Sequence, residues 1–236
     1  MSNAREPALR AVLIDLDGTL ADTAADLAEA ANRVRADFGL PPLATARLAS
    51  FVGKGAEVLV HRALTDRHDG TVDEPSIARG REAFRRHYHE TNGVSTRPFE
   101  GVPAALARLR GAGLRLACVT NKPREFTIPL LEKIGLAPFF EAVVAGDDVP
   151  RKKPHPDLVL EACRRLGVAP GLALLIGDSG NDAGAAIAAG SRCVLVETGY
   201  NEGEPVRSLE GAPGVGAILP GIPEAAGWIL QHARAP

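Results

Sequence analysis

Long hydrophobic runs are missing from this sequence. No apolar stretch approaches the roughly 18 residues that a membrane-spanning helix needs, and residues 1–10 are polar, without the apolar centre of a signal peptide. A strong charge of one sign is missing as well, since the formal net charge is -2 and the sequence pI is about 6.3. We therefore expect no membrane and no nucleic-acid partner, because electrostatic attraction to either needs a basic surface.

Cysteine is also scarce, with 3 residues in the chain. Cys118, Cys163 and Cys193 lie far apart and in apolar surroundings. An odd number of scattered cysteines argues against a disulfide framework or a zinc site and favours reduced thiols in a core. We expect a cytoplasmic protein. No internal repeat is visible.

The pattern of the remaining residues divides the chain into an α/β part and a helical part. From residue 101 onward, apolar strands alternate with helix-length stretches, which is typical of βαβ units in a doubly wound parallel sheet. Before them, apolar residues recur at helical spacing and no strand pattern is present. We expect an α/β core domain of residues 1–22 and 97–236, and a small all-helical domain of residues 23–96 inserted after the first strand. The predicted strands lie near residues 12–14, 114–119, 142–145, 172–176 and 193–196.

The most informative stretch is residues 12–20. An apolar run ends on Asp15, and Asp17 follows two residues later. A buried strand has little reason to end on paired acids unless a cation or a reaction awaits them, because an unpaired buried carboxylate is costly. Gly18 allows a sharp turn, and Thr19 offers a hydroxyl and a backbone N–H at the same edge.

Polar residues follow two further predicted strands. Thr120 and Asn121 come after one of them and Asp178 after another. Ligands of an open α/β sheet bind outside the carboxyl ends of its strands. Any one of these residues is explained by chance placement in a loop, but residues from three strands at one edge indicate a site.

These residue types suit a phosphate ester held beside a cation. Carboxylates such as Asp15 and Asp178 are ligands for Mg²⁺, which commonly joins one or two carboxylates to a substrate phosphate. The Thr120 hydroxyl and the Asn121 amide are phosphate ligands by type. Lys153, in a proline-stiffened segment, offers an ammonium to neutralise a transferred phosphoryl group, although a lysine alone is more often solvated.

Taken together, these motifs resemble those of the haloacid dehalogenase superfamily of phosphatases. The first motif, Asp-x-Asp-Gly-Thr, is matched at residues 15–19, and the second, a Ser or Thr that ends a strand, at Thr120. The third, a Lys before Pro-x-Pro, is matched at Lys153, and the fourth, Gly-Asp-Ser-x-x-Asp, at residues 177–182. All four occur in order, so the resemblance covers nearly the whole chain. It implies a Rossmann-like core with a helical cap of the first insertion type.

The resemblance also implies roles for individual residues. Asp15 is the expected nucleophile, which forms an aspartyl-phosphate. Asp17 is the expected acid that protonates the leaving alcohol and the base that then activates water. Asp15, Asp178 and the backbone carbonyl of Asp17 are the expected ligands of Mg²⁺.

Further residues are expected to bind the substrate or to orient these groups. Thr19, Thr120 and Asn121 are substrate-binding candidates, and Lys153 is expected to steady the charge of the nucleophile and of the phosphate. Asp182, with Ser179 beside it, is expected to orient Lys153 or a metal-bound water. The alternative for Asp182 is an N-cap of the following helix.

Three segments narrow the resemblance to phosphoglycolate phosphatases. Residues 51–55 are similar to a Val-Gly-x-Gly segment in the caps of that group, and residues 199–205 and 153–156 are similar to its loops. This implies 2-phosphoglycolate as substrate, with Lys54 meeting its carboxylate. The alternative is that the glycines around Lys54 make a turn and that Lys54 is solvated.

Other functions remain open on the sequence alone. They include another sugar-phosphate phosphatase, a pyrophosphatase and a phosphotransferase similar to β-phosphoglucomutase. Asp17 argues against a dehalogenase or a phosphonate hydrolase, which lack this second acid. A phosphate-ligand sensor or an interaction module on the same scaffold is the non-enzymatic alternative. We expect a small phosphate ester as the partner and a monomer or homodimer.

Overall fold

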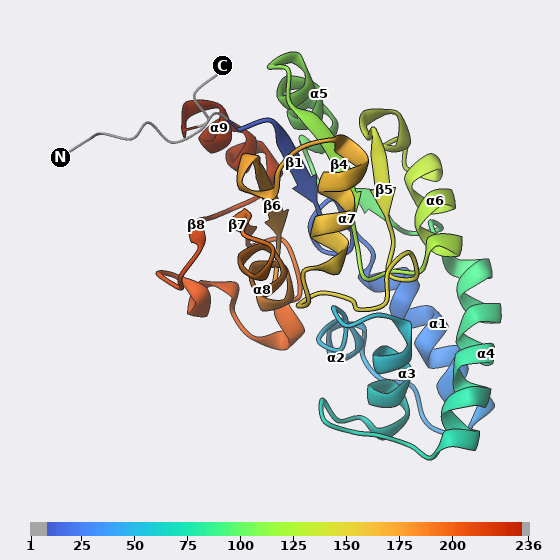
Figure 1. Ribbon diagram of the computed structural model, residues 1–236. Coiled ribbons are helices and arrows are strands. Elements are labelled where there is room, and N and C mark those ends of the chain that lie inside the picture. Colours follow the sequence, from blue (N-terminus) through green and yellow to red (C-terminus); the bar gives the residue numbers. More distant parts are fainter. Residues whose placement is uncertain (1–8, 233–236) are drawn as a thin grey trace.

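The centre of the molecule is a six-stranded sheet whose neighbouring strands are all parallel (Figure 1). The computed structural model describes residues 9–232. From edge to edge the strands are β5 (Ala142–Val144), β4 (Arg115–Val119), β1 (Ala11–Ile14), β6 (Ala173–Gly177), β7 (Arg192–Val196) and β8 (Val215–Leu219).

Helices cover both faces of this sheet. Successive side chains of a strand point to opposite faces, and β1 accordingly divides between two apolar clusters. Val12 and Ile14 pack with α5, α6 and α9, whereas Ala11 and Leu13 pack with α7 and α8. The predicted doubly wound α/β fold is confirmed. These helices are α5 (Val102–Gly111), α6 (Arg124–Lys133), α7 (Asp157–Leu166), α8 (Gly180–Ala188) and α9 (Ile222–His232).

The last strand and the last helix were not predicted from the sequence. The predicted sheet ended near residue 196, whereas β8 pairs with β7 and α9 covers one face beside α5. β8 is an edge strand without a fully buried residue, and Gly216 interrupts its apolar pattern. Glycine inside a short strand weakens the strand signal.

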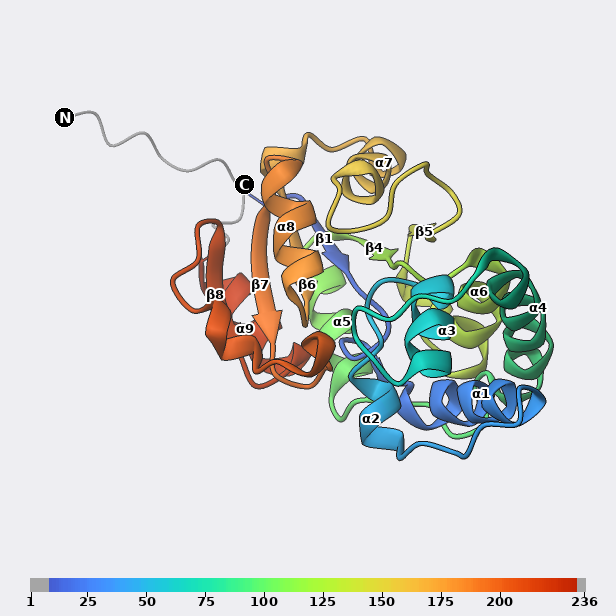
Figure 2. The same cartoon turned by 90° about the horizontal axis from the view of Figure 1, so that it is seen from below.

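Part of the chain between β1 and β4 forms a separate helical layer, which we call the helical unit (residues 24–91). Figures 1 and 2 show it beyond the carboxyl ends of the strands, beside the sheet rather than on either of its faces. Its helices enclose their own apolar cluster, to which Phe126 of α6 also belongs. The strands β2 (Ala21–Asp22) and β3 (Arg97–Pro98) pair where the chain enters and leaves this unit. The four helices are α1 (Ala24–Asp37), α2 (Thr45–Ala49), α3 (Ala56–Thr65) and α4 (Glu74–Thr91).

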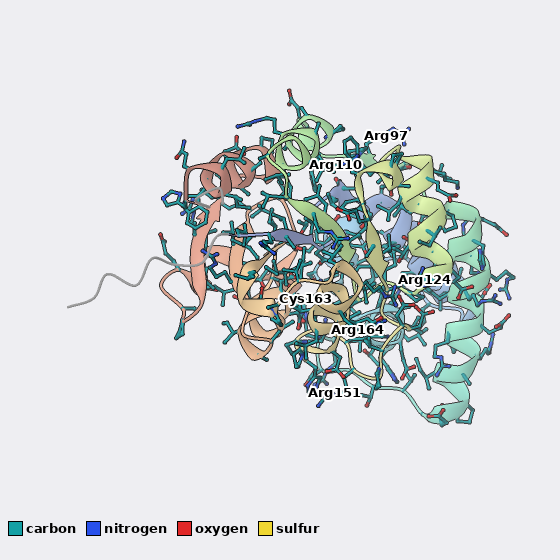
Figure 3. All side chains as sticks on the ribbon, turned by 45° about the horizontal axis from the view of Figure 1, so that its top comes forward. Arg97, Arg110, Arg124, Arg151, Cys163 and Arg164 are labelled. Atoms are coloured by element: carbon teal, nitrogen blue, oxygen red, sulfur yellow. The ribbon has the colours of Figure 1, made fainter. Side chains whose placement is uncertain are left out.

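The three cysteines lie in the core, as predicted. All are free and buried, and Cys163 lies on α7 (Figure 3). Burial raises the pKa of the Cys163 thiol to about 11, which keeps it protonated and unreactive near neutral pH. Among residues 9–232, no helix is both long enough and apolar enough to cross a membrane.

A buried carboxylate links the segments through which the chain enters and leaves the helical unit. Asp26 on α1 is 2% exposed and accepts hydrogen bonds from the backbone N–H groups of Gly93, Ser95 and Thr96, at 2.8–3.0 Å. The Thr96 hydroxyl donates a fourth bond at 2.6 Å. The start of the unit is therefore tied to the segment through which the chain leaves it.

We expect Asp26→Ala to destabilise the fold by about 3 kcal/mol or more, because it leaves several buried donors without an acceptor. Urea unfolding measures this free energy. Asp69→Ala is the control, since Asp69 is exposed and pairs with Arg67 two residues away, and it should leave the urea midpoint unchanged. Equal midpoints for the two variants would show that the Asp26 contacts do not stabilise the fold.

Candidate active site

The site begins with the register of the three central strands. Ile14 of β1 pairs with Cys118 of β4 and with Ile176 of β6. Asp15 therefore emerges level with the ends of its neighbours, and its backbone N–H bonds the Ile176 carbonyl at 2.9 Å. Strand order reverses on either side of β1. This switch point of a parallel sheet is where a ligand site is expected.

Lys153 lies directly beside Asp15. Its ammonium Nζ is 2.9 Å from Asp15 Oδ1 and 2.6 Å from Asp182 Oδ1, and it donates to the Val119 carbonyl at 3.0 Å. Burial opposes the charged form, but the two carboxylates outweigh it and raise the pKa of Lys153. The site thus holds a permanent cation against the predicted nucleophile.

Asp182 holds Lys153 and helps to cap α8. Its Oδ2 accepts from the backbone N–H and the hydroxyl of Ser179, at 3.2 and 2.7 Å, in a reciprocal capping box. Ser179 is the N-cap of α8, and Asp182 lies three residues on, so Asp182 is not itself the cap. A Cβ on Gly177 would lie only 2.1 Å from Asp182 Cγ, so this arrangement needs glycine there.

Asp178 is held from two sides. Thr19 donates its hydroxyl proton to Oδ1 at 2.8 Å, and the Tyr200 backbone N–H donates to Oδ2 at 2.9 Å. A Cβ on Gly199 would come within 1.9 Å of Oδ2, so the loop approaches this closely only because residue 199 is glycine. The hydroxyl of Thr19, a predicted substrate ligand, is directed at Asp178.

The carboxylates of this cluster fit a hard cation. One oxygen each of Asp15, Asp178 and Asp182 lie within 4.8 Å of one another. Burial first, and the neighbouring acids in addition, raise the pKa of Asp15 to about 8 and that of Asp178 to about 6. Asp182 contacts Lys153 through Oδ1 and Ser179 through Oδ2, whereas Lys153 contacts Asp15 through Oδ1. Asp15 and Asp178 are therefore the acids that fit a hard cation, which takes oxygen ligands.

These raised pKa values predict how stability changes with pH. The folded state favours protonated Asp15, whose ordinary pKa is 3.8, so this contribution to stability is present below about pH 4 and is lost as pH rises to about 8. In the presence of chelator, the Tm of wild type should fall relative to the Tm of Asp15→Asn over this pH window. The change in the Tm difference should be at least ~2–4 °C, equivalent to about 1 kcal/mol. Mg²⁺ should reduce the fall, because it stabilises the ionised acids. Parallel Tm curves would contradict the raised pKa.

Asp17 contacts a second buried lysine. Lys122 Nζ lies 2.9 and 3.2 Å from the two carboxylate oxygens of Asp17 and donates to the Tyr88 hydroxyl at 2.6 Å. Tyr88 comes from α4 of the helical unit and is 1% exposed. Asp17 is therefore connected through Lys122 to the helical unit.

The remaining polar residues at the end of β4 organise the loops. The Thr120 hydroxyl accepts from the Lys122 backbone N–H at 3.2 Å. The Asn121 amide donates to the Gly53 and Lys153 carbonyls at 2.8 and 3.0 Å, and its oxygen accepts from the Lys153 N–H. Asn121 thus ties the helical unit to the Lys153 loop, while its role toward phosphate stays a prediction.

Lys54 forms an ion pair outside this cluster of acids and lysines. Its ammonium pairs with Glu202 at 3.1 Å, and the nearly buried Arg62 pairs with the other oxygen of Glu202 at 2.9 Å. Glu202 has a φ of 54° and also accepts from Asn181 at 3.1 Å. Burial opposes its ionisation, but these donors lower the pKa of Glu202. Lys54 does not line the cavity described next, and its predicted substrate contact stays a prediction.

A small cavity of about 50 Å³ lies between the sheet edge and the helical unit. Its lining contains the predicted nucleophile and acid together with apolar side chains. The polar residues are Asp15, Asp17, Tyr88, Thr120, Asn121, Lys122, Asp178, Ser179, Tyr200 and Asn201, and the apolar ones include Leu27, Val52, Leu59, Phe84 and Phe126.

Sequence reasoning missed Lys122, Tyr88, Arg62 and Glu202. Lys122 had a detectable signal, because it continues the polar run after β4. Tyr88 had none, since it follows Phe84 at helical spacing, and its 5.2 Å stacking on that ring is ordinary core packing.

This fold and this site define a class of protein: a parallel α/β protein with an aspartate and lysine cluster at the switch point of its sheet. The chain belongs to the haloacid dehalogenase-like hydrolase family, whose model matches residues 12–196.

Relatives within this family span almost the whole chain. The chain is 47% identical over 225 residues to a phosphoglycolate phosphatase of Nitrosospira multiformis, covering 95% of this chain and 97% of the relative. It is similar to a crystal structure described as a predicted phosphoglycolate phosphatase from Haemophilus somnus, with a TM-score of 0.84, 29% identity, and coverage of 93% and 97%. It also resembles CbbY from Rhodobacter sphaeroides in complex with phosphate, with a TM-score of 0.74, 27% identity, and coverage of 92% and 96%.

Proposed function

We propose that this protein is a Mg²⁺-dependent phosphatase that hydrolyses 2-phosphoglycolate to glycolate and phosphate. One observation supports this most directly. Asp15 lies 2.9 Å from the Lys153 ammonium, and both Asp15 and Asp17 line a cavity of about 50 Å³. A nucleophile beside a fixed cation and a second acid are what phosphate-monoester hydrolysis requires. The phosphoglycolate phosphatase relatives favour 2-phosphoglycolate as the ester.

In the proposed reaction, a carboxylate oxygen of Asp15 attacks phosphorus and the bond to the ester oxygen breaks. Asp17 gives its proton to the departing alkoxide, which leaves as an alcohol. Asp17, now ionised, takes a proton from water, and the hydroxide attacks the phosphorus of the aspartyl-phosphate. The acyl-phosphate P–O bond breaks, which releases phosphate and restores Asp15. Asp15, Asp178 and the backbone carbonyl of Asp17 would hold Mg²⁺, which supplies positive charge to the phosphoryl oxygens.

We further propose that residues 23–96 act as a cap over the core of residues 1–22 and 97–236. Three contacts support this: Asn121 with Gly53, Lys122 with Tyr88, and Glu202 with Arg62. Each joins a loop at the sheet edge to the helical unit, and the cavity is bounded by both. Separation of the two parts would admit substrate, and their approach would exclude water.

A sugar phosphate is the second candidate substrate. CbbY has been crystallised with phosphate and, in a mutant form, with xylulose-(1,5)bisphosphate. The 47% identity to a phosphoglycolate phosphatase, against 27% to CbbY, favours phosphoglycolate.

The test is phosphate release from 2-phosphoglycolate, glucose 1-phosphate, pyrophosphate and 4-nitrophenyl phosphate, with Mg²⁺ and with chelator. We expect Mg²⁺-dependent release with a strong preference for 2-phosphoglycolate. Preference for another ester would support the phosphatase function but would exclude 2-phosphoglycolate as the substrate. Absence of release from every compound would favour a phosphotransferase or a non-catalytic phosphate sensor.

A further inference from the structure

One lysine that lines the cavity has no role in the proposed reaction. Within residues 9–232, the cavity lining includes a single cationic side chain, Lys122. Lys153 pairs with Asp15 and does not line the cavity, and Lys54 and Arg62 are paired with Glu202. An anionic group on the leaving side of a substrate would therefore meet Lys122 before any other positive charge.

Lys122 is held in place from several directions. Its side chain is 3% exposed, bonds Asp17 and Tyr88, and lies 4.7 Å from the centre of the Tyr88 ring. Its backbone N–H donates to Thr120, and its carbonyl accepts from Gly146 at 2.9 Å. An ammonium has three protons. Tyr88 uses one, and the Asp17 carboxylate can share a second, which leaves one for a ligand.

The position of Lys122 matches the chemistry of the proposed substrate. Asp17 is the proposed proton donor to the ester oxygen, so that oxygen must lie beside Asp17. In 2-phosphoglycolate, one methylene separates the ester oxygen from the carboxylate. A cation 2.9 Å from Asp17 thus lies where this carboxylate would fall. The lining also includes Leu27, Leu59 and Phe84, whose side chains offer no hydrogen-bond donor.

We propose that Lys122, anchored by Tyr88, is the residue that recognises the carboxylate of the leaving group and so determines substrate choice. This rests on the proposed function and assigns to Lys122 the contact that sequence similarity implied for Lys54. Because Tyr88 belongs to the helical unit, the recognition site is complete only when this unit lies against the sheet edge.

The test compares 2-phosphoglycolate with 2-hydroxyethyl phosphate, which has the same chain length but a neutral alcohol in place of the carboxylate. In wild type, kcat/KM should favour 2-phosphoglycolate. Lys122→Met should reduce this preference at least about 30-fold, because the carboxylate loses its charged partner. Tyr88→Phe, which removes a single oxygen, should reduce it several-fold. Lys133→Met is the matched control, since Lys133 lies outside the cavity and bonds the Asn92 carbonyl, and it should keep the wild-type preference.

Other outcomes overturn the proposal. Equal loss for both substrates in Lys122→Met would mean that Lys122 only positions Asp17. Collapse of the preference in Lys54→Met, with Lys122→Met unaffected, would assign the contact to Lys54 instead.

A binding measurement separates this inference from the proposed function. Asp15→Asn and Asp15→Asn/Lys122→Met are compared by calorimetry with both esters, since neither variant should turn them over. We expect Asp15→Asn to bind 2-phosphoglycolate more tightly than 2-hydroxyethyl phosphate, and the double variant to bind them equally. This result would support Lys122 recognition even if phosphate release failed. Equal binding by the Asp15→Asn protein, or binding of neither ester, would refute it.

Discussion

Asp15→Asn is expected to lower phosphate release by at least about 10⁴-fold, the scale on which loss of a hydrolase nucleophile is measured. The amide that replaces the carboxylate cannot form the aspartyl-phosphate. Without this nucleophile, water would have to attack the phosphorus of the ester directly. The measurement is steady-state release from 2-phosphoglycolate with saturating Mg²⁺.

The fold should survive this change. Asp15 is a buried acid with its pKa raised to about 8, so a neutral isostere relieves repulsion from Asp178 and Asp182. Urea unfolding at pH 8 should show stability no lower than in wild type. Asp37→Asn is the matched control, since Asp37 lies on the helical unit and pairs with Arg86 and His87, and it should keep wild-type activity. Retention of activity in Asp15→Asn within about tenfold would refute the assigned nucleophile.

Asp17→Asn is expected to lower kcat for 2-phosphoglycolate by about 10²–10⁴-fold, the usual contribution of a general acid or base. An alkoxide leaves poorly without a proton, and Asn has none to give at the required acidity. Nitrophenolate is a far better leaving group, so the loss with 4-nitrophenyl phosphate should be much smaller. The ratio of the two losses is the measurement.

Two results would change the interpretation of Asp17. Equal losses with both esters would indicate that Asp17 positions Lys122 or the metal instead of donating a proton. Wild-type turnover of 2-phosphoglycolate would exclude the acid–base role. Wild-type activity of the Asp37→Asn protein toward both esters would again show that exchange of an acid for an amide elsewhere is harmless.

Much of the site was predictable because it depends on local sequence. Asp15, Thr120 and Asp178 each follow an apolar run, and parallel strands deliver their carboxyl ends to one edge whatever the details of packing. The α/β fold followed from the same alternation of strands and helices. The strand β8 was not predicted because an edge strand with an internal glycine has a weak strand pattern in the sequence.

The sequence by itself thus determined the parallel sheet, the edge at which the acids gather and the family. Only the tertiary structure decided which lysine faces the cavity. Lys54 and Lys122 are both plausible from their surroundings in the chain, but Lys54 is paired with Glu202 and Lys122 with Asp17 and Tyr88. These partners lie 34 or more residues apart in the chain. Such pairs depend on how the helical unit packs against the sheet edge, and no periodicity within either segment encodes that packing.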